Sequence, residues 1–297
     1  FSPRAARGLS MTIEEIRKEM DALDDKIADL FVERMNCAAL IAEEKRKNKL
    51  PVESEERRKY VENRIAGRVP KEYSSYARAL FSTMMSLSYS FQNELVYQSS
   101  LGKILEDVLK ESAVLPGKAT VAYGDDRAEL AVRALFSRPD SLKLNGAGEL
   151  FDALDKGLCD YGVVAASAGA AEYVHDGYDL LAKHGCYILA RCETKQGKFL
   201  LISKKLQIFP DADKISFIMS LQNRPGALNA VLSKFYSMGI NITKLETRDV
   251  HGDGSVWSLY LDVEANVREE GVAALLTEFE SSPDRFTLLG CYPEKTV

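Results

Sequence analysis

The chain is poor in histidine, in cysteine and in long apolar runs. It has three histidines and five scattered cysteines among 297 residues, and neither set has the spacing of metal ligands or of a disulfide framework. No apolar run approaches the length that spans a bilayer. The formal net charge of −5 lacks the basic excess of nucleic-acid-binding surfaces. These absences predict a cytoplasmic protein without a zinc site or histidine-based metal centre, and with no membrane or nucleic-acid partner.

The N-terminal third of the chain is predicted to be helical, in a chain whose length is typical of two or three domains. Residues 1–10 lack an apolar core, so we expect a cloning remnant ahead of a native Met11 and not a signal peptide. An all-helical domain is expected over 11–100, followed by a helical linker over 101–116. The expected helices of the domain cover residues 12–48, the stretch between Ser54 and Gly67, and residues 71–98.

The pattern changes after Pro116-Gly117. Residues 117–210 alternate short strands and helices, which predicts an α/β domain. Its strands are expected at 119–123, 161–165, 187–190 and 199–202, and its helices at 128–136 and 149–156. Residues 213–297 predict an α+β ferredoxin-like unit in the order βαββαβ. Its elements are strand 215–221, helix 226–237, strands 241–248 and 255–263, helix 268–279 and strand 285–290.

The first expected helix carries an arginine within an apolar stripe. No glycine or proline interrupts residues 12–48, so a helix of roughly 55 Å is expected, and it must pack against other helices or a second copy. Arg34 is the one charged residue among stripe positions Ile13, Ile16, Met20, Leu23, Ile27, Leu30, Arg34, Cys37 and Ile41. A buried cation needs an anion. Taken alone, Arg34 is better explained as a register device or as a side chain that snorkels to the surface. Arg17 and Lys45 nearby shift the balance to a site for a small polyanion.

This region closely resembles the all-helical chorismate mutase family. The resemblance rests on residues 16–48, on PVESEERR at 51–58 and on MMSLSYSFQ at 84–92. It implies rearrangement of chorismate to prephenate without a metal or cofactor. It further implies that Arg17, from the partner of an interlocked dimer, and Arg34 bind the two substrate carboxylates. Lys45 and Gln92 would donate to the ether oxygen, and Arg57 and Ser88 would complete the pocket.

Two positions depart from the family pattern Asp-x-x-Arg-Glu, because the chain reads Ser54-Glu55-Glu56-Arg57-Arg58 there. The chain has Arg58 where the family has a glutamate that accepts from the substrate hydroxyl. A second cation there is expected to weaken hydroxyl recognition and turnover, unless Ser54, Glu55 or a carbonyl group substitutes for the glutamate.

The middle region resembles a prephenate dehydratase in ATVAYG, in residues 153–181 and in KFLLISKK. That family has two α/β lobes with substrate in the cleft between them, whereas residues 117–205 suffice for one lobe. The glycine-rich turn is shortened to Gly124-Asp125-Asp126, and Ala165–Ala168 replace a Pro-x-Glu-Asn-Ser loop. The proton-donating threonine of Thr-Arg-Phe is Gly197, which has no group to protonate a leaving hydroxyl. We expect a truncated domain that has lost dehydratase activity.

The last region resembles an amino-acid-binding ACT domain over residues 220–249. Pro225-Gly226 opens a helix whose free amides can receive a carboxylate. The resemblance implies phenylalanine as effector and pairing across subunits, in a homodimer or tetramer. Asp249 replaces the proline of the family's Glu-Ser-Arg-Pro, which leaves the ligand open. The expected effector-binding residues are Asn223, Gly226, Ala227, Leu228, Glu246, Thr247 and Arg248.

Taken together, these regions predict a chorismate mutase with a degenerate dehydratase-like domain and a regulatory ACT domain. Two alternatives remain. One is a working bifunctional mutase/dehydratase, against which the missing lobe and Gly197 count. The other is a non-catalytic amino-acid sensor with a disabled mutase pocket, for which Arg58 is the supporting feature.

Overall fold

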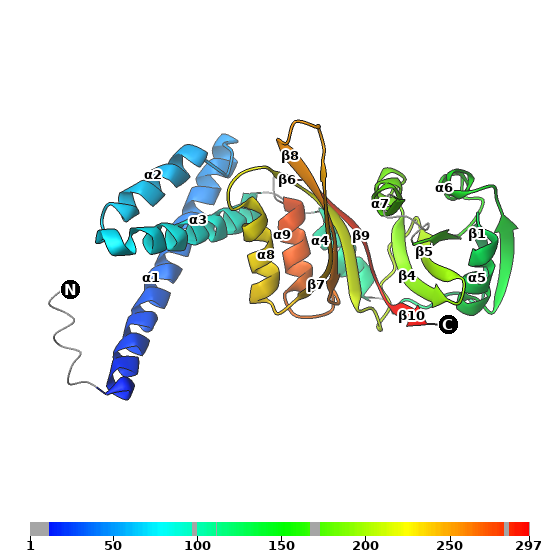
Figure 1. Cartoon of the computed structure of the whole chain (residues 1–297), viewed down its shortest axis with the longest axis horizontal. Coiled ribbons are helices and arrows are strands. Elements are labelled where there is room, and N and C mark those ends of the chain that lie inside the picture. Colours follow the sequence, from blue (N-terminus) through cyan, green and yellow to red (C-terminus); the bar gives the residue numbers. More distant parts are fainter. Residues whose placement is uncertain (1–11, 97–99, 111, 167–172, 282–284, 297) are drawn as a thin grey trace. The chain divides into compact units, whose positions relative to one another are not determined.

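The protein consists of two compact units, one up to residue 98 and one from residue 99 onward (Figure 1). A computed structural model describes residues 12–96, 100–110, 112–166, 173–281 and 285–296. The expected remnant at 1–10 and Ser167-Ala168 of the expected loop lie outside these residues. Within the described residues, none of the helices combines the length and apolar character that crossing a membrane requires.

The first unit is helical, as predicted. Helix α1 (Ile13–Asn48) begins at a capping box in which Thr12 and Glu15 satisfy each other's backbone amides, and it ends where Lys49 adopts left-handed φ and ψ. Helix α2 (Glu55–Ala66) is capped by Ser54. The expected third helix is a 3-10 turn, η2 (Lys71–Tyr73), followed by α3 (Ser74–Val96).

The apolar stripe of α1 is mostly uncovered in the single chain. α3 packs against both α1 and α2, and the buried core beside it is small: Val52, Val61, Met85 and Tyr89. Along the N-terminal part of α1, every stripe residue is at least 39% exposed: Ile13, Ile16, Met20, Leu23, Ile27 and Leu30. A stripe this long and this exposed is typical of a surface that another chain covers.

The second unit begins with α4 (Ser100–Lys110), which we expected to be a linker. Its Leu101 and Leu105 are buried in the core of the C-terminal region, and α4 packs against α9. The α/β region that follows holds one six-stranded sheet in the order β10-β4-β5-β3-β1-β2. Its elements are β1 (Lys118–Tyr123), η3 (Asp126–Ala128), α5 (Glu129–Leu135), β2 (Arg138–Lys143), α6 (Ala147–Asp155), β3 (Tyr161–Ala165), α7 (Tyr173–Lys183), β4 (Tyr187–Thr194) and β5 (Gly197–Ser203).

The α/β region therefore has one lobe. β4 and β5 form an antiparallel hairpin in which Thr194 pairs with Gly197, so two residues connect the strands. The expected strands and helices are present. β2 and α7 were not predicted, and neither was the C-terminal strand β10 (Glu294–Thr296).

The C-terminal region has the predicted βαββαβ order. Its elements are β6 (Lys214–Gln222), α8 (Ala227–Ser237), β7 (Asn241–Asp249), β8 (Val256–Glu264), α9 (Val272–Ser281) and β9 (Phe286–Tyr292). The sheet order is β7-β8-β6-β9. α8 and α9 cover one face, where the Phe217 ring stacks with those of Phe235 and Phe279. The other face carries Tyr260, Leu289 and Tyr292 into a core shared with the α/β lobe.

The chain passes from the C-terminal sheet back to the six-stranded sheet between β9 and β10. After β9, Pro293 accepts a hydrogen bond from the amide of Arg191, and β10 pairs in parallel with β4 (Figure 1). β9 passes so close to β4 that a Cβ at Gly290 would overlap the carbonyl oxygen of Ile188. Glycine is required at this crossing because no larger residue leaves room for the Ile188 backbone.

We predict that Gly290→Ala destabilises the second unit by about 1–3 kcal/mol or more, because the overlap is with rigid backbone. The measurement is chemical unfolding followed by the fluorescence of the single tryptophan, Trp257 in β8. Gly148→Ala in α6 is the matched control, since a Cβ there meets no atom within 4 Å. A Gly290→Ala midpoint equal to that of Gly148→Ala would contradict the prediction.

Candidate active site on the helical unit

Arg34 holds its charge against neutral acceptors on α3. Its guanidinium donates to the carbonyl oxygen of Met84 at 3.0 Å and to the hydroxyl of Ser88. A second nitrogen lies 3.2 Å from the sulfur of Met85. The hydroxyl of Ser88 donates in turn to the Met84 carbonyl at 2.9 Å. These neutral groups therefore orient the guanidinium of Arg34 but do not neutralise its positive charge.

Lys45 lies beyond Arg34 on α1 and reaches the same helix. Its ammonium group donates to Oε1 of Gln92 at 3.1 Å and to the backbone carbonyl of Val52. Ser88 and Gln92 are both buried, at 4% and 3% exposure. α1 and α3 thus bring together four predicted site residues: Arg34, Lys45, Ser88 and Gln92.

Desolvation dominates the electrostatics of this cluster. Burial lowers the pKa of Arg34, and it also lowers the pKa of Lys45 against the opposing effect of Glu53. Among the ion pairs of the described residues, none includes Arg34 or Lys45. Two partly buried cations without a carboxylate partner form a site that favours an anion.

Tyr89 is a member of the cluster that the sequence reasoning missed. Its hydroxyl donates to the carbonyl of Ser54 at 3.0 Å. Its ring lies 5.6 Å from the ammonium of Lys45 and 5.2 Å from the guanidinium carbon of Arg58. Burial is the main reason that the pKa of Tyr89 is raised. Its position directly after Ser88 in a predicted helix was the available signal.

Of the two adjacent arginines on α2, Arg58 faces the cluster and Arg57 does not. Arg58 donates to the hydroxyl of Ser86 at 3.1 Å, and its side chain is 13% exposed. Arg57, expected to complete the pocket, is exposed and stacks over the ring of Tyr60 at 5.0 Å.

Two other predicted residues stay apart from the cluster in the single chain. Arg17 lies on the exposed N-terminal part of α1. Ser54 is exposed, and its side chain accepts from the amide of Arg57 as the cap of α2.

The predicted effector residues lie on two separate elements of the C-terminal region. Asn223 donates to the Gly254 carbonyl at 2.7 Å, and Gly226 has φ of 85° at the start of α8. Ala227 and Leu228 follow in the first turn of α8. Glu246, Thr247 and Arg248 lie on edge strand β7, which β8 separates from β6.

The dehydratase-like positions surround an apolar cavity of about 260 Å³ at the carboxyl ends of β1 and β3. The carboxylate of Asp125 at its rim is paired with Arg127 at 2.6 Å. The hydroxyl of Tyr178 is directed to Asp262 at 2.6 Å. Gly197 is the exposed first residue of β5 and does not line this cavity, so it brings no proton donor to it.

Comparison with known proteins assigns families to two parts of the chain. Residues 16–93 match the family Chorismate mutase type II, and residues 215–283 match the ACT domain. The chain is 23% identical to a bifunctional chorismate mutase/prephenate dehydratase of Aquifex aeolicus (strain VF5), an alignment that covers 95% of this chain and 98% of that protein. It is 32% identical over 99 residues to a prephenate dehydratase of Methanocaldococcus jannaschii, covering 32% of this chain and 36% of that one.

A solved structure of a prephenate dehydratase from Streptococcus mutans is 23% identical, with a TM-score of 0.49 over 60% of this chain and 100% of that one. The Aquifex aeolicus alignment extends over 358 positions although this chain has 297 residues. At least 61 residues of that relative, the difference between the two numbers, therefore have no counterpart here.

Proposed function

Because residues 16–93 form a chorismate mutase type II domain and residues 215–283 an ACT domain, we propose that this protein rearranges chorismate to prephenate in the biosynthesis of aromatic amino acids. The observation that carries the proposal is the pair of desolvated cations, Arg34 and Lys45, held by neutral groups of α3 and the α1–α2 connection. Chorismate is a dicarboxylate, which supplies the missing negative charge.

The pericyclic step forms no covalent intermediate, so the protein has to position the substrate and stabilise charge. The Arg34 fork is oriented by Ser88 and suits a bidentate carboxylate. Lys45 and Gln92 lie 3.1 Å apart and are proposed to donate to the ether oxygen. Negative charge grows on this oxygen as its bond lengthens, so the contact strengthens in the transition state, as catalysis requires.

The second carboxylate is proposed to bind Arg17 of a second copy. Arg17 shares the exposed N-terminal part of α1 with the uncovered stripe from Ile13 to Leu30. A homodimer that covers this stripe would bring the partner's α1, and with it Arg17, to the cluster. Pairing of ACT units would extend the assembly to a tetramer.

We predict that Arg17→Ala and Arg34→Ala are each nearly inactive, and that co-refolding them in equal amounts restores about a quarter of wild-type activity. Half of randomly assembled dimers are mixed, and one of the two sites in each is intact. The measurement is chorismate consumption. Arg34→Ala mixed with the Arg17→Ala/Arg34→Ala double variant is the control, because no intact site can form. Verified mixed dimers without recovered activity would place both arginines of a site on one chain.

Arg58 is the residue from which we propose a low turnover of chorismate. It stands close to Tyr89 and Ser86, at a position where the resemblance implies an acceptor for the substrate hydroxyl. A guanidinium has no acceptor. We therefore propose modest turnover.

The α/β lobe is proposed to lack dehydratase activity. Asp125, the acid that lines the cavity at the carboxyl ends of β1 and β3, is paired with Arg127. Gly197, which stands where the resemblance implies a proton donor, has no side chain. The resemblance also implies that dehydratases bind substrate in a cleft between two lobes, whereas this α/β region has one lobe.

We predict that the purified protein converts chorismate to prephenate and forms no phenylpyruvate. The measurement is chromatography of reactions stopped without acid, with prephenate supplied directly as a second substrate. Enzyme-dependent phenylpyruvate from prephenate would establish the bifunctional enzyme. Unchanged chorismate would leave a non-catalytic sensor.

The ACT domain is proposed to bind phenylalanine as a regulatory ligand. The amides at the start of α8, where Gly226 opens the helix, can receive its carboxylate. Regulation then requires that phenylalanine bind two states of the protein with different affinity.

We predict that phenylalanine at about 100 times its Kd stabilises the second unit by about 2.7 kcal/mol, read from Trp257 fluorescence on unfolding. Leu228→Asp should abolish the effect, because a carboxylate on the first turn of α8 repels that of the ligand. Ser233→Asp, which adds the same charge at an exposed position more than one turn further along α8, should retain most of it. Absence of stabilisation in the wild type would remove phenylalanine as the effector.

A further inference from the structure

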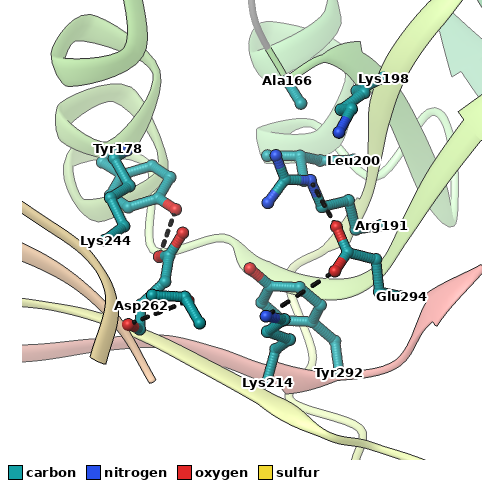
Figure 2. Close-up of a pocket in the computed structure, with 11 residues that line it drawn as sticks. Ala166, Tyr178, Arg191, Lys198, Leu200, Lys214, Lys244, Asp262, Tyr292 and Glu294 are labelled. Atoms are coloured by element: carbon teal, nitrogen blue, oxygen red, sulfur yellow. Dashed lines mark hydrogen bonds and ion pairs between the residues drawn. The ribbon is translucent and has the colours of Figure 1, made fainter. Parts of the chain in front are cut away.

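A second cavity of about 340 Å³ lies within the second unit, between the α/β lobe and the sheet of the C-terminal region (Figure 2). The lobe contributes Arg191 of β4 and Lys198 of β5. The C-terminal sheet contributes Lys214 of β6 and Lys244 of β7. Two carboxylates, Asp262 and Glu294, also line it. Cations thus exceed anions by two along the wall, in a chain whose net charge is −5.

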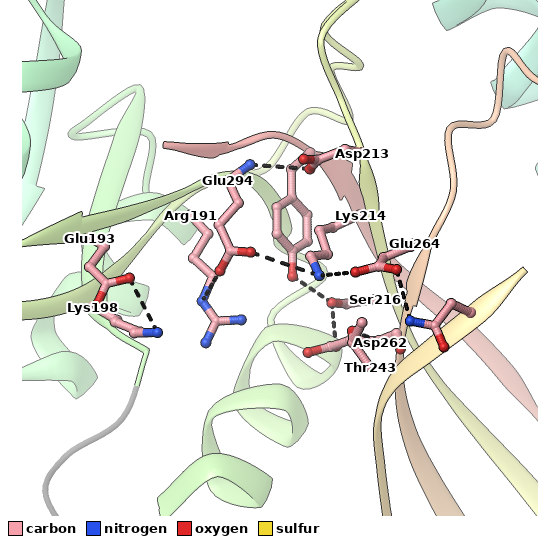
Figure 3. Close-up of polar contacts among 12 residues, drawn as sticks. Arg191, Glu193, Lys198, Asp213, Lys214, Ser216, Thr243, Asp262, Glu264 and Glu294 are labelled. Atoms are coloured by element: carbon pink, nitrogen blue, oxygen red, sulfur yellow. Dashed lines mark hydrogen bonds and ion pairs between the residues drawn. The ribbon is translucent and has the colours of Figure 1, made fainter. Parts of the chain in front are cut away.

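The two carboxylates are already engaged by the protein. Oδ1 of Asp262 accepts hydrogen bonds from the hydroxyls of Tyr178 and Ser216, both at 2.6 Å. Glu294 is shared between two cations (Figure 3): its oxygens lie 3.3 Å from Nε of Arg191 and 3.8 Å from the ammonium of Lys214. These contacts fix the acidic groups at the wall of the cavity.

The cations of the wall also have acidic neighbours, and Lys214 lies 3.4 Å from Glu264. The ammonium of Lys244 lies 4.3 Å from the centroid of the Tyr178 ring, which adds a cation–π contact to its acidic neighbour. Its side chain is 19% exposed, and Glu246 is 3.8 Å away. Burial lowers the pKa of Lys244, and the charge of Arg191 acts in the same direction, whereas Asp262 and Glu246 oppose it. Like charges therefore face one another across this space.

Figure 2 shows how these side chains are arranged. The guanidinium of Arg191 and the ammonium of Lys198 extend into the space that separates them from Tyr178 and Lys244. Lys198 contacts Glu193 at 3.2 Å, with both side chains more than 40% exposed, so an anion can displace this contact at little cost.

We propose that this cavity binds a small dianion, carrying two carboxylates or a phosphate, between the α/β lobe and the C-terminal sheet. The volume suits a small metabolite. The four cations that line the wall would contact the dianion, whose oxygens would separate Arg191 from Lys244 and compete with the exposed acidic partner of Lys198. The ligand would contact both sheets, so its binding would stabilise their packing. This site lies outside the helical unit, and it stands whether or not the mutase proposal holds.

The test is isothermal titration calorimetry of the full chain at low chloride with inorganic phosphate and, separately, with succinate. We expect at least one of them to bind with Kd below about 10 mM. Lys244→Met and Lys198→Met should each weaken binding by about tenfold or more, because each removes one positive charge from the wall. The probe that binds more tightly tells the phosphate class from the dicarboxylate class.

Two controls make the result specific. Lys195→Met removes an exposed lysine from the turn of the same β4–β5 hairpin and should bind normally. Arg34→Ala removes the cation of the helical unit, so the binding that persists in this variant is binding outside the helical unit. If Lys244→Met fails to fold, the exposed Lys198→Met decides. Absence of binding of both probes, or equal affinity in the wall variants and the wild type, would overturn the proposal.

Discussion

The hydrogen bonds from the Arg34 guanidinium to the Met84 carbonyl and the Ser88 hydroxyl keep a cation partly buried without neutralising it. Neutral acceptors return part of the hydration that the guanidinium loses, but they leave its charge unmatched. Gln92 and the Val52 carbonyl hold Lys45 in the same way, and the charge of Glu53 opposes only part of the effect of its burial. An anion that enters this cluster gains electrostatic energy that the folded protein has left available. The stripe of α1 is likewise exposed in the single chain, with Ile13, Met20, Leu23, Ile27 and Leu30 all more than half exposed.

Local signals were sufficient to predict most elements of the fold. The uninterrupted run over residues 12–48 marked the extent of α1, Ser54 the start of α2 and Gly226 the start of α8. The 3.6-residue period of α1 also identified Arg34 as a stripe position. This succeeded because caps and periodicity depend on residues within one or two turns.

The features that could not be predicted depend on contacts between distant segments. Strand β2 is largely polar, and it forms because β1 offers a parallel partner. The three residues of β10 pair with β4, which lies about 100 residues earlier in the chain. The choice between Arg57 and Arg58 depends on how α2 is rotated about its axis, and Val61 of α2 packs in one cluster with Met85 and Tyr89 of α3. Each of these features depends on residues that lie far apart in the sequence, so a short stretch of sequence does not reveal it.

Packing gives a physical reason why a lobe without dehydratase chemistry would be retained. One face of the C-terminal sheet is covered by α8 and α9, and the other buries Tyr260, Leu289 and Tyr292 against the lobe. Removal of the lobe would expose this second face, at roughly 25 cal/mol for each Å² of apolar surface, and would leave Asp262 without the Tyr178 hydroxyl. β10 would also lose its partner strand. The lobe and the C-terminal sheet therefore support each other, so the sequence of the lobe can lose catalytic groups more readily than the lobe itself can be lost.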